Sequence, residues 1–250
     1  MSRWSTIGTV TVLLIGGTLA LTLVVLLSLE RLVRTGIERI GSEQAKVAVT
    51  VREVRISLLH GRARIEDLTV ANPSGYQSSV ALSVRSIAAE WDWRSLSSNR
   101  IELSEIVIDG PELNFEGSWS DNNLETIRKN LIGTARAETR HEPSSAASTN
   151  RYLVRRLSIV DTRVNLRIRT GSFQSSAEGI RLRPITVEHL GDPSHPLSTA
   201  DLAAKVFDAL TQETVGSIGK TASGVIGKSA EDAGKSVGRA VDGFRRLFSK

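Results

Sequence analysis

Three Gly-Lys-Ser/Thr triplets, which begin at Gly219, Gly227 and Gly234, are the first residues whose types and spacing suggest chemistry. A phosphate-binding loop needs another glycine five positions before the glycine of the triplet, and a strand that leads into it. Those positions hold Thr, Ala and Ser in this chain. We therefore interpret the triplets as small residues of a helix, with lysines that extend to its surface.

A second candidate for chemistry is the cluster of His189, Asp192 and His195 in the segment HLGDPSHP. Its prolines predict a surface loop, and no further ligand lies at metal-binding spacing. The chain has no cysteine and no Gly-x-Ser-x-Gly motif, so a thiolate metal site and a cysteine or serine nucleophile have no support. The sequence thus predicts no catalytic residue, no metal site and no cofactor, and a protein that is not an enzyme.

Length and charge limit the remaining classes. The 250 residues allow one or two domains. The net charge is +5, from 32 basic and 27 acidic residues, but the two signs are interspersed along the chain. A nucleic-acid groove needs a basic stripe, so we expect no nucleic-acid partner.

The N-terminal region contains an apolar run over residues 7–29, which is 23 residues without a charge. As a helix it would extend roughly 34 Å and could cross a hydrocarbon core of about 30 Å. A cleaved signal peptide is the alternative, but its apolar part is usually shorter and ends in a small-x-small site that is not found here. We predict a transmembrane anchor over residues 1–30, with these anchor residues: Trp4 at the headgroups, then Ile7, Leu13, Leu14, Leu21, Leu26 and Leu29.

A β-domain is expected over residues 31–132. A short helical continuation over residues 30–46 comes first, and from Val47 the pattern changes to a period of two, which is typical of β-strands. The apolar parity slips after Val51 and again after Val84, so bulges are needed to keep one face apolar. A third slip follows Leu103. Similar strands return over residues 151–197, which gives eight or nine strands without long intervening helices. The pattern predicts a curved antiparallel sheet whose apolar face must be covered.

Helices and a linker complete the predicted organisation. A short helix is expected over 123–131, and residues 133–150, which have almost no large apolar side chains, predict a flexible linker. Residues 198–250 predict an amphipathic helical tail with an N-cap at Ser198 or Thr199. The apolar side chains of this tail form one stripe along the helix, which could pack on a membrane surface, on the open sheet or on a sister helix. The candidate membrane-surface residues are Val215, Ile218, Ile226, Val237, Phe244, Arg245, Arg246 and Phe248.

The sheet region resembles the AsmA-like proteins of bacterial envelopes over about residues 1–132. The resemblance rests on the order of its motifs: a membrane helix, a strand pair with Gly61 between the strands, the turn Asn72-Pro73-x-Gly75 and a Trp/Leu-rich corner. A strand that closes on Asp109-Gly110-Pro111 and a helix start at Asn123-Leu124 follow. A plain anchored β-sandwich, similar to the water-stress proteins, is the alternative fold.

The resemblance implies a single-pass inner-membrane protein with a cytoplasmic N-terminus and a periplasmic sheet, related to bridge-like lipid-transfer proteins. The charge count opposes this orientation weakly, because Arg31, Arg34 and Arg39 follow the apolar run and only Arg3 precedes it. We follow the resemblance, since sizeable domains can be translocated largely regardless of charge. The implied fold class is mainly β with helical ends: a transmembrane helix, an AsmA-like groove or half-barrel, and an amphipathic helix.

Two functions follow from this organisation. In the first, the apolar face is a groove that binds membrane lipid and contributes to envelope lipid homeostasis or outer-membrane assembly. In the second, the C-terminal helix closes the sheet, and the protein is a structural scaffold that acts through envelope protein partners. The sequence does not define an oligomeric state. The candidate groove residues are Val49, Val51, Ile56, Leu82, Val84, Trp91, Ile106, Ile108 and Phe115.

Overall fold

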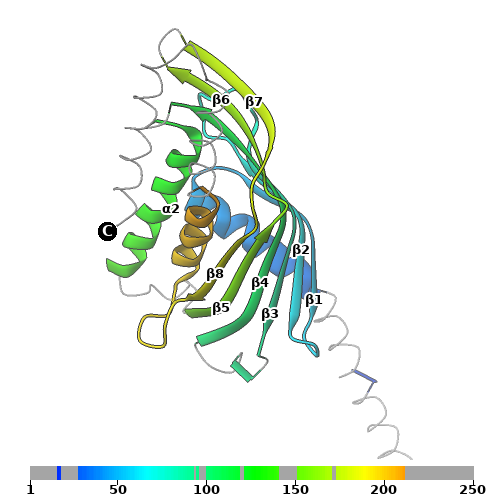
Figure 1. The fold of residues 1–250 in the computed structure, drawn as a ribbon. Coiled ribbons are helices and arrows are strands. Elements are labelled where there is room, and N and C mark those ends of the chain that lie inside the picture. The colour runs from blue at the N-terminus through cyan, green and yellow to red at the C-terminus, as the bar shows by residue number, and fades with distance from the viewer. Residues whose placement is uncertain are drawn as a thin grey trace, which may run out of the picture.

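The computed structural model describes residues 16–17, 28–92, 94–95, 100–118, 121–140, 151–170 and 173–211 (Figure 1). Within these residues no helix is both long and apolar enough to cross a membrane. Most of the predicted anchor, and the whole predicted stripe from Val215 to Phe248, lie outside the described residues. Leu29 is the one anchor residue named above that is described, and it is half-buried in a helix over residues 28–45.

One curved, unclosed sheet of eight strands forms the body of the protein. Its main path runs β1-β2-β3-β4-β5-β8, and β6 and β7 continue the sheet beyond one half of β4. The strands are β1 (Val49–Ser57), β2 (Arg62–Ala71), β3 (Val80–Trp91), β4 (Arg100–Gly117), β5 (Arg151–Val160), β6 (Arg163–Thr170), β7 (Phe173–Arg181) and β8 (Ile185–Leu190).

The expectation of a purely antiparallel sheet was wrong, because β4 pairs in parallel with both β5 and β6. A parallel pair needs a crossover, which here contains α2 (Asn123–Arg140). The helix extends well beyond the predicted 123–131 and takes the first part of the predicted linker. Its added residues include Ala, Arg and Glu, which favour helix even though they offer little apolar surface.

A transverse crease crosses the sheet and accounts for two of its slips of parity. Inward-facing residues change parity between Val51 and Val54 on β1 and between Val84 and Ile87 on β3, which confirms both predicted slips. The predicted bulges are wrong at these positions, because the pairing register of β1 with β2, of β2 with β3 and of β3 with β4 continues unchanged across the slips. Away from the crease, the β3–β4 register shifts between Glu90 and Trp91 and skips Ser104, so the third predicted slip is confirmed as a bulge. The backbone at the crease has positive φ at Asp67, Gly110 and Asp161. The irregular positions of neighbouring strands lie opposite one another without a shift of register, so the sheet can bend along one line.

The strand predicted to close on Asp109-Gly110-Pro111 does not end there. β4 continues through Pro111 to Gly117, and Pro111 is buried on the concave face. A proline cannot donate to a sheet ladder and is tolerated at a bulge. The Gly-Pro pair therefore marks the crease and not the end of the strand.

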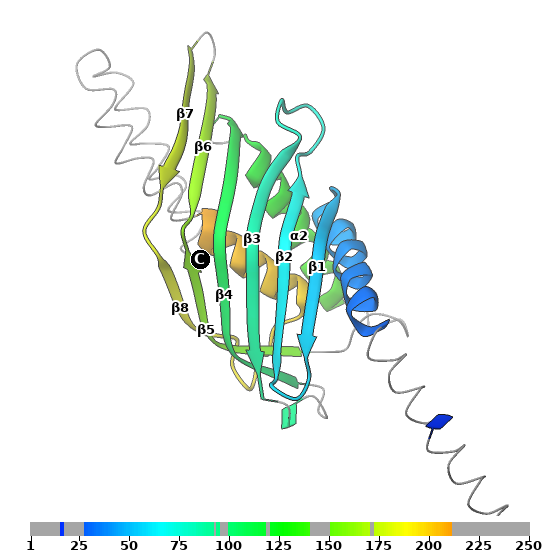
Figure 2. The ribbon, with the colours of Figure 1, turned by 90° about the vertical axis from the view of Figure 1, so that its right-hand side faces the viewer.

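Three helices lie on the concave side of the sheet, and no helix among the residues that the structure describes lies on the convex side (Figures 1 and 2). They are the helix over residues 28–45, α2, and a helix over residues 199–211. The last begins as predicted, because the Ser198 hydroxyl accepts a hydrogen bond from the Asp201 N–H at 3.1 Å. In return, the Asp201 carboxylate accepts a hydrogen bond from the Ser198 backbone N–H at 3.2 Å, which completes a reciprocal cap.

The helix over residues 28–45 protects the free edge of β1. Its Glu38 carboxylate accepts a hydrogen bond from the Val51 N–H at 2.9 Å, and its Ser42 hydroxyl accepts one from the Val49 N–H at 2.8 Å. One turn earlier Arg34 donates to the Arg52 carbonyl at 3.2 Å. An exposed edge strand presents unpaired N–H and C=O groups to which another strand could pair, and these side chains bond to such groups of β1.

We predict that Phe207→Ala lowers the free energy of unfolding by about 3–5 kcal/mol, because it opens a cavity between the helix over residues 199–211 and the sheet. Phe207 is buried in the core cluster. Lys205→Ala, on the exposed side of the same helix, is the matched control and should stay within about 0.5 kcal/mol of the parent. Urea unfolding followed by circular dichroism measures both. Equal values for the two variants would show that this helix does not seal the core.

Candidate functional site

The candidate groove residues do share one face, the concave face of the sheet. Seven of the nine are buried and belong to the core or its cluster, while Ile56 and Trp91 are half-buried at the end of the sheet that holds the β1–β2 turn. The residues that the sequence pattern assigns to one face therefore do lie on one face of the sheet. The buried residues are Val49, Val51, Leu82, Val84, Ile106, Ile108 and Phe115.

This concave face is covered, and the cover comes from the chain itself. α2 contributes Leu124, Ile127 and Leu131 to the same apolar cluster, and the helix over residues 199–211 contributes Ala204, Phe207 and Leu210. Ile127 and Leu210 are each 1% exposed. The helices thus occupy the space next to the sheet where an acyl chain would lie in an open groove (Figure 1).

The three covering helices are joined to one another by polar contacts. The Arg128 guanidinium of α2 bonds to the Asp208 carboxylate at 2.7 Å, which links α2 to the helix over residues 199–211. The Asn130 amide of α2 donates to the Ala45 carbonyl at 2.9 Å, which links α2 to the helix over residues 28–45. The cover is therefore a connected layer centred on α2.

A buried polar cluster fixes the start of α2 to the sheet. Asn123 is fully buried; its side-chain oxygen accepts from the Glu116 N–H at 2.9 Å, and its side-chain amide donates to the Asn114 carbonyl at 2.6 Å. The same amide donates to the Asn72 side-chain oxygen at 2.8 Å. Asn122 caps the helix by accepting from the Glu125 N–H at 2.8 Å. Full satisfaction of such groups specifies one docking position.

Glu116 is the ionisable member of this cluster. Its carboxylate accepts hydrogen bonds from the Gln77 and Ser78 N–H groups, each at 2.7 Å, and lies 3.4 Å from the Arg167 guanidinium. Burial alone would raise the pKa of Glu116. The bonds from Ser78 and Gln77, together with the charge of Arg167, outweigh burial and hold the pKa below its usual value. The ionised carboxylate thus ties the β2–β3 turn to β4.

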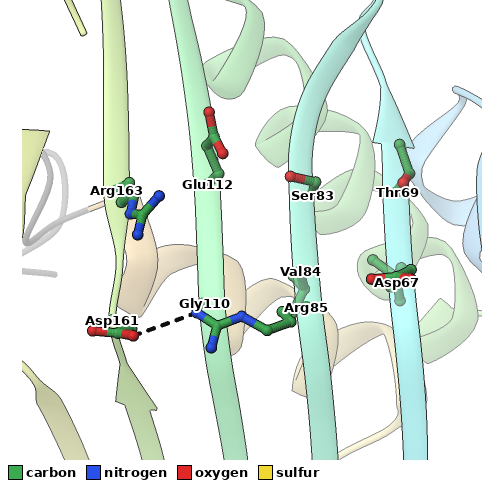
Figure 3. A pocket seen from close by; sticks show the side chains of 10 residues that line it. Asp67, Thr69, Ser83, Val84, Arg85, Gly110, Glu112, Asp161 and Arg163 are labelled. Atoms are coloured by element: carbon green, nitrogen blue, oxygen red, sulfur yellow. Dashed lines mark hydrogen bonds and ion pairs between the residues drawn. The ribbon is translucent and has the colours of Figure 1, made fainter. Parts of the chain in front are cut away.

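On the convex face an open depression of about 400 Å³ follows the crease (Figure 3). The Arg85 side chain extends from β3 across β4 (Figure 3). Its guanidinium lies 3.2 Å from the Asp109 carboxylate and 3.4 Å from the Asp161 carboxylate. It passes over Gly110, where an added Cβ would lie 2.7 Å from the Arg85 Nε. Glu112 accepts a hydrogen bond from the Asn165 amide at 2.7 Å.

These outer-face contacts bind strands to one another. The Arg85 ion pairs are more than half exposed on the arginine side and so contribute little stability. Their clearest effect is orientation, since Arg85 connects β3 to β4 and to the bend between β5 and β6 at the crease. Nothing in the pairing marks a nucleophile, a base or a metal ligand, and the described residues hold no group of three or more His, Asp or Glu that could bind a metal ion.

The His189, Asp192 and His195 cluster lies on the surface, as predicted, but only Asp192 and His195 are in a loop, because His189 is an exposed residue of β8. His195 Nδ1 is 3.5 Å from the Asp192 carboxylate, and the His195 side chain is strongly exposed. The N–H groups of His195 and Ser194 donate to that carboxylate and lower the pKa of Asp192. Asp192 therefore stabilises the turn that it begins.

Sequence reasoning missed the Glu116 cluster and the Arg85 crossing. Asn72 and Asn123 had been noted as part of the resemblance, but their mutual hydrogen bond joins residues 51 positions apart. No local signal predicts such a contact. Gly110 did carry a signal, since a glycine inside a strand pattern often marks a bulge or a close approach.

Comparisons of the chain with protein-family models, with curated proteins and with solved structures found no match.

We predict that Glu116→Gln lowers the free energy of unfolding near neutral pH by about 1.5–3 kcal/mol, because it removes charge-assisted hydrogen bonds. The lowered pKa of Glu116 means that its ionised form stabilises the fold fully above the unfolded value of about 4.5 and that this stabilisation is lost as the pH falls through the folded value. The gap between parent and variant should therefore shrink in acid.

Urea titrations between about pH 6 and about pH 3 measure this gap, with Glu43→Gln as the control because Glu43 is exposed on the helix over residues 28–45. A gap for Glu116→Gln that stays constant over this range would contradict the assignment.

Proposed function

We propose that the protein is a membrane-anchored, non-enzymatic scaffold of the bacterial cell envelope, whose curved sheet is closed by its own helices. The observation that carries the proposal is the covered concave face. α2 and the helix over residues 199–211 share one apolar cluster with the predicted groove residues. A preformed lipid site needs an accessible apolar cavity, and here that space is filled by side chains.

The scaffold role is further supported by how the polar residues are used. Asn123 and Glu116 bond to the backbone of other elements and hold α2 and the β2–β3 turn in place. Arg85 on the convex face pairs with Asp109 on β4 and with Asp161 in the bend between β5 and β6. These polar and charged side chains therefore join one element of the fold to another, which is a structural role.

The membrane and envelope parts of the proposal rest on the sequence. The uncharged run over residues 7–29 is long enough to span, and the resemblance to AsmA-like proteins implies an inner-membrane position with a cytoplasmic N-terminus and a periplasmic sheet. In this arrangement the convex face, where Arg and Glu side chains of neighbouring strands pair, is the surface offered to envelope protein partners.

Lipid handling is the second candidate function. It is favoured by the continuity of the apolar lining, which reaches from buried Phe115 to half-buried Trp91 along the concave face. It would require the helix over residues 199–211 to leave the sheet and admit an acyl chain. The same face then serves both candidates, and they differ in whether lipid ever replaces the helix.

Photo-crosslinking separates the two candidates. We predict that p-benzoylphenylalanine introduced at Phe115, which is 3% exposed under the helices, forms crosslinks only within the chain when the full-length protein is irradiated in bacterial cells. The position already holds an aromatic residue, so the probe changes shape modestly. The matched control places the same probe at Leu21, in the predicted anchor, where lipid adducts are expected.

Mass spectrometry of the purified protein reads both positions. A phospholipid adduct at position 115 would contradict the closed scaffold and establish lipid handling. Absence of lipid adducts at position 21 would instead contradict membrane anchoring.

A further inference from the structure

Two leucines form the tip of the β1–β2 hairpin, a position where tight turns normally place Gly, Asn, Asp, Ser or Pro. Leu59 is 95% exposed and Leu58 is 42% exposed. The turn that holds them is well bonded, since the His60 N–H donates to the Ser57 carbonyl and the Gly61 N–H donates to the Leu58 carbonyl, each at 3.2 Å. The leucines are therefore presented to solvent by a defined turn.

The hairpin is also fixed to the neighbouring strand. The Trp91 N–H donates to the Gly61 carbonyl at 2.9 Å. A Cβ at Gly61 would lie 2.5 Å from the Trp91 carbonyl oxygen, so glycine at this position lets β3 approach the turn closely. The tip consequently keeps its direction relative to the sheet.

The hairpin tip lies at the same end of the molecule as the start of the helix over residues 28–45 (Figure 2). The Glu30 carboxylate accepts a hydrogen bond from the Ile56 N–H at 3.2 Å, only two residues before Leu58. Leu32, one turn into the helix, is 70% exposed. Three of the four exposed large apolar side chains among the described residues thus gather where the uncharged run over residues 7–29 joins the helix.

We infer that Leu58, Leu59 and Leu32 form a membrane-contacting tip, which enters the interface of the same bilayer that residues 7–29 span. The inference rests on the proposed membrane anchoring and adds a second point of contact to it. Single exposed apolar residues are ordinary on a protein surface. A group of them next to the end of the predicted anchor, however, would lie close to the bilayer. Arg31 is exposed next to Leu32, where anionic headgroups would meet it.

A two-point contact fixes the orientation of the sheet. One anchor alone leaves the domain free to tilt and rotate above the bilayer, whereas a hairpin tip inserted beside it holds the strands at a set angle to the surface. The convex face would then stay accessible to partners on one side of the anchor.

The chain has no cysteine, so single labelled cysteines test the inference in the full-length protein. Leu59→Cys, Ser74→Cys and Leu21→Cys are each labelled with the environment-sensitive fluorophore NBD and reconstituted into vesicles of phosphatidylethanolamine and phosphatidylglycerol. Ser74 is the matched control, because it is exposed in the β2–β3 turn at the opposite end of the sheet. Leu21 reports on the anchor itself.

We expect the emission of the label at position 59 to shift to the blue and to be quenched by doxyl-labelled lipid. The label at position 74 should instead be quenched by aqueous iodide. A label at position 59 that behaves like the one at position 74, while position 21 is quenched by lipid, would overturn the membrane-contacting tip and leave the anchor intact. Shielding from iodide at position 59 without lipid quenching would overturn it in favour of a protein contact. Loss of lipid quenching at position 21 would overturn the proposed anchoring, and the tip with it.

Discussion

Burial of one apolar sheet face is the constraint on which the rest of this structure depends. A sheet with one polar and one apolar face must cover the apolar face, and this chain does so with its own helices. The position of α2 follows from that need, since the chain must cross the concave face to return to the sheet. The crossover then makes β5 and β6 parallel to β4. The polar cluster of Asn123 and Glu116 sets where the crossing begins.

Curvature has its own physical cause in the crease, where neighbouring strands are irregular at the same level of the sheet. At the crease the strands gain an extra outward-facing residue, and positive φ at Asp67, Gly110 and Asp161 allows the backbone to bend there. The bend creates a concave face that fits helices, and on the convex side it opens the depression crossed by Arg85. Curvature, cover and outer-face charge are therefore parts of one arrangement.

The sequence predicted those features that are recorded in local periodicity. The slips after Val51 and Val84 are visible because valine and isoleucine change parity there, and Ser198 is visible as a cap because the helix pattern starts directly after it. The parallel pairing of β4 with β5 and β6 could not be predicted, since much of the crossover between β4 and β5 has few large apolar residues and is typical of a linker. The contact of Asn72 with Asn123 depends on topology alone, so no pattern of neighbours could reveal it.

The central claim is that the helix layer stays closed over the concave face, and a distance measurement between spin labels tests it most directly. Labels at Lys205→Cys, on the exposed side of the helix over residues 199–211, and at Thr50→Cys, exposed on β1, report the separation of cover and sheet in the full-length, membrane-reconstituted chain. The account predicts a single narrow distance distribution that added phospholipid leaves unchanged. A second, longer distance that grows with added lipid would contradict it, because the cover would then be a lid.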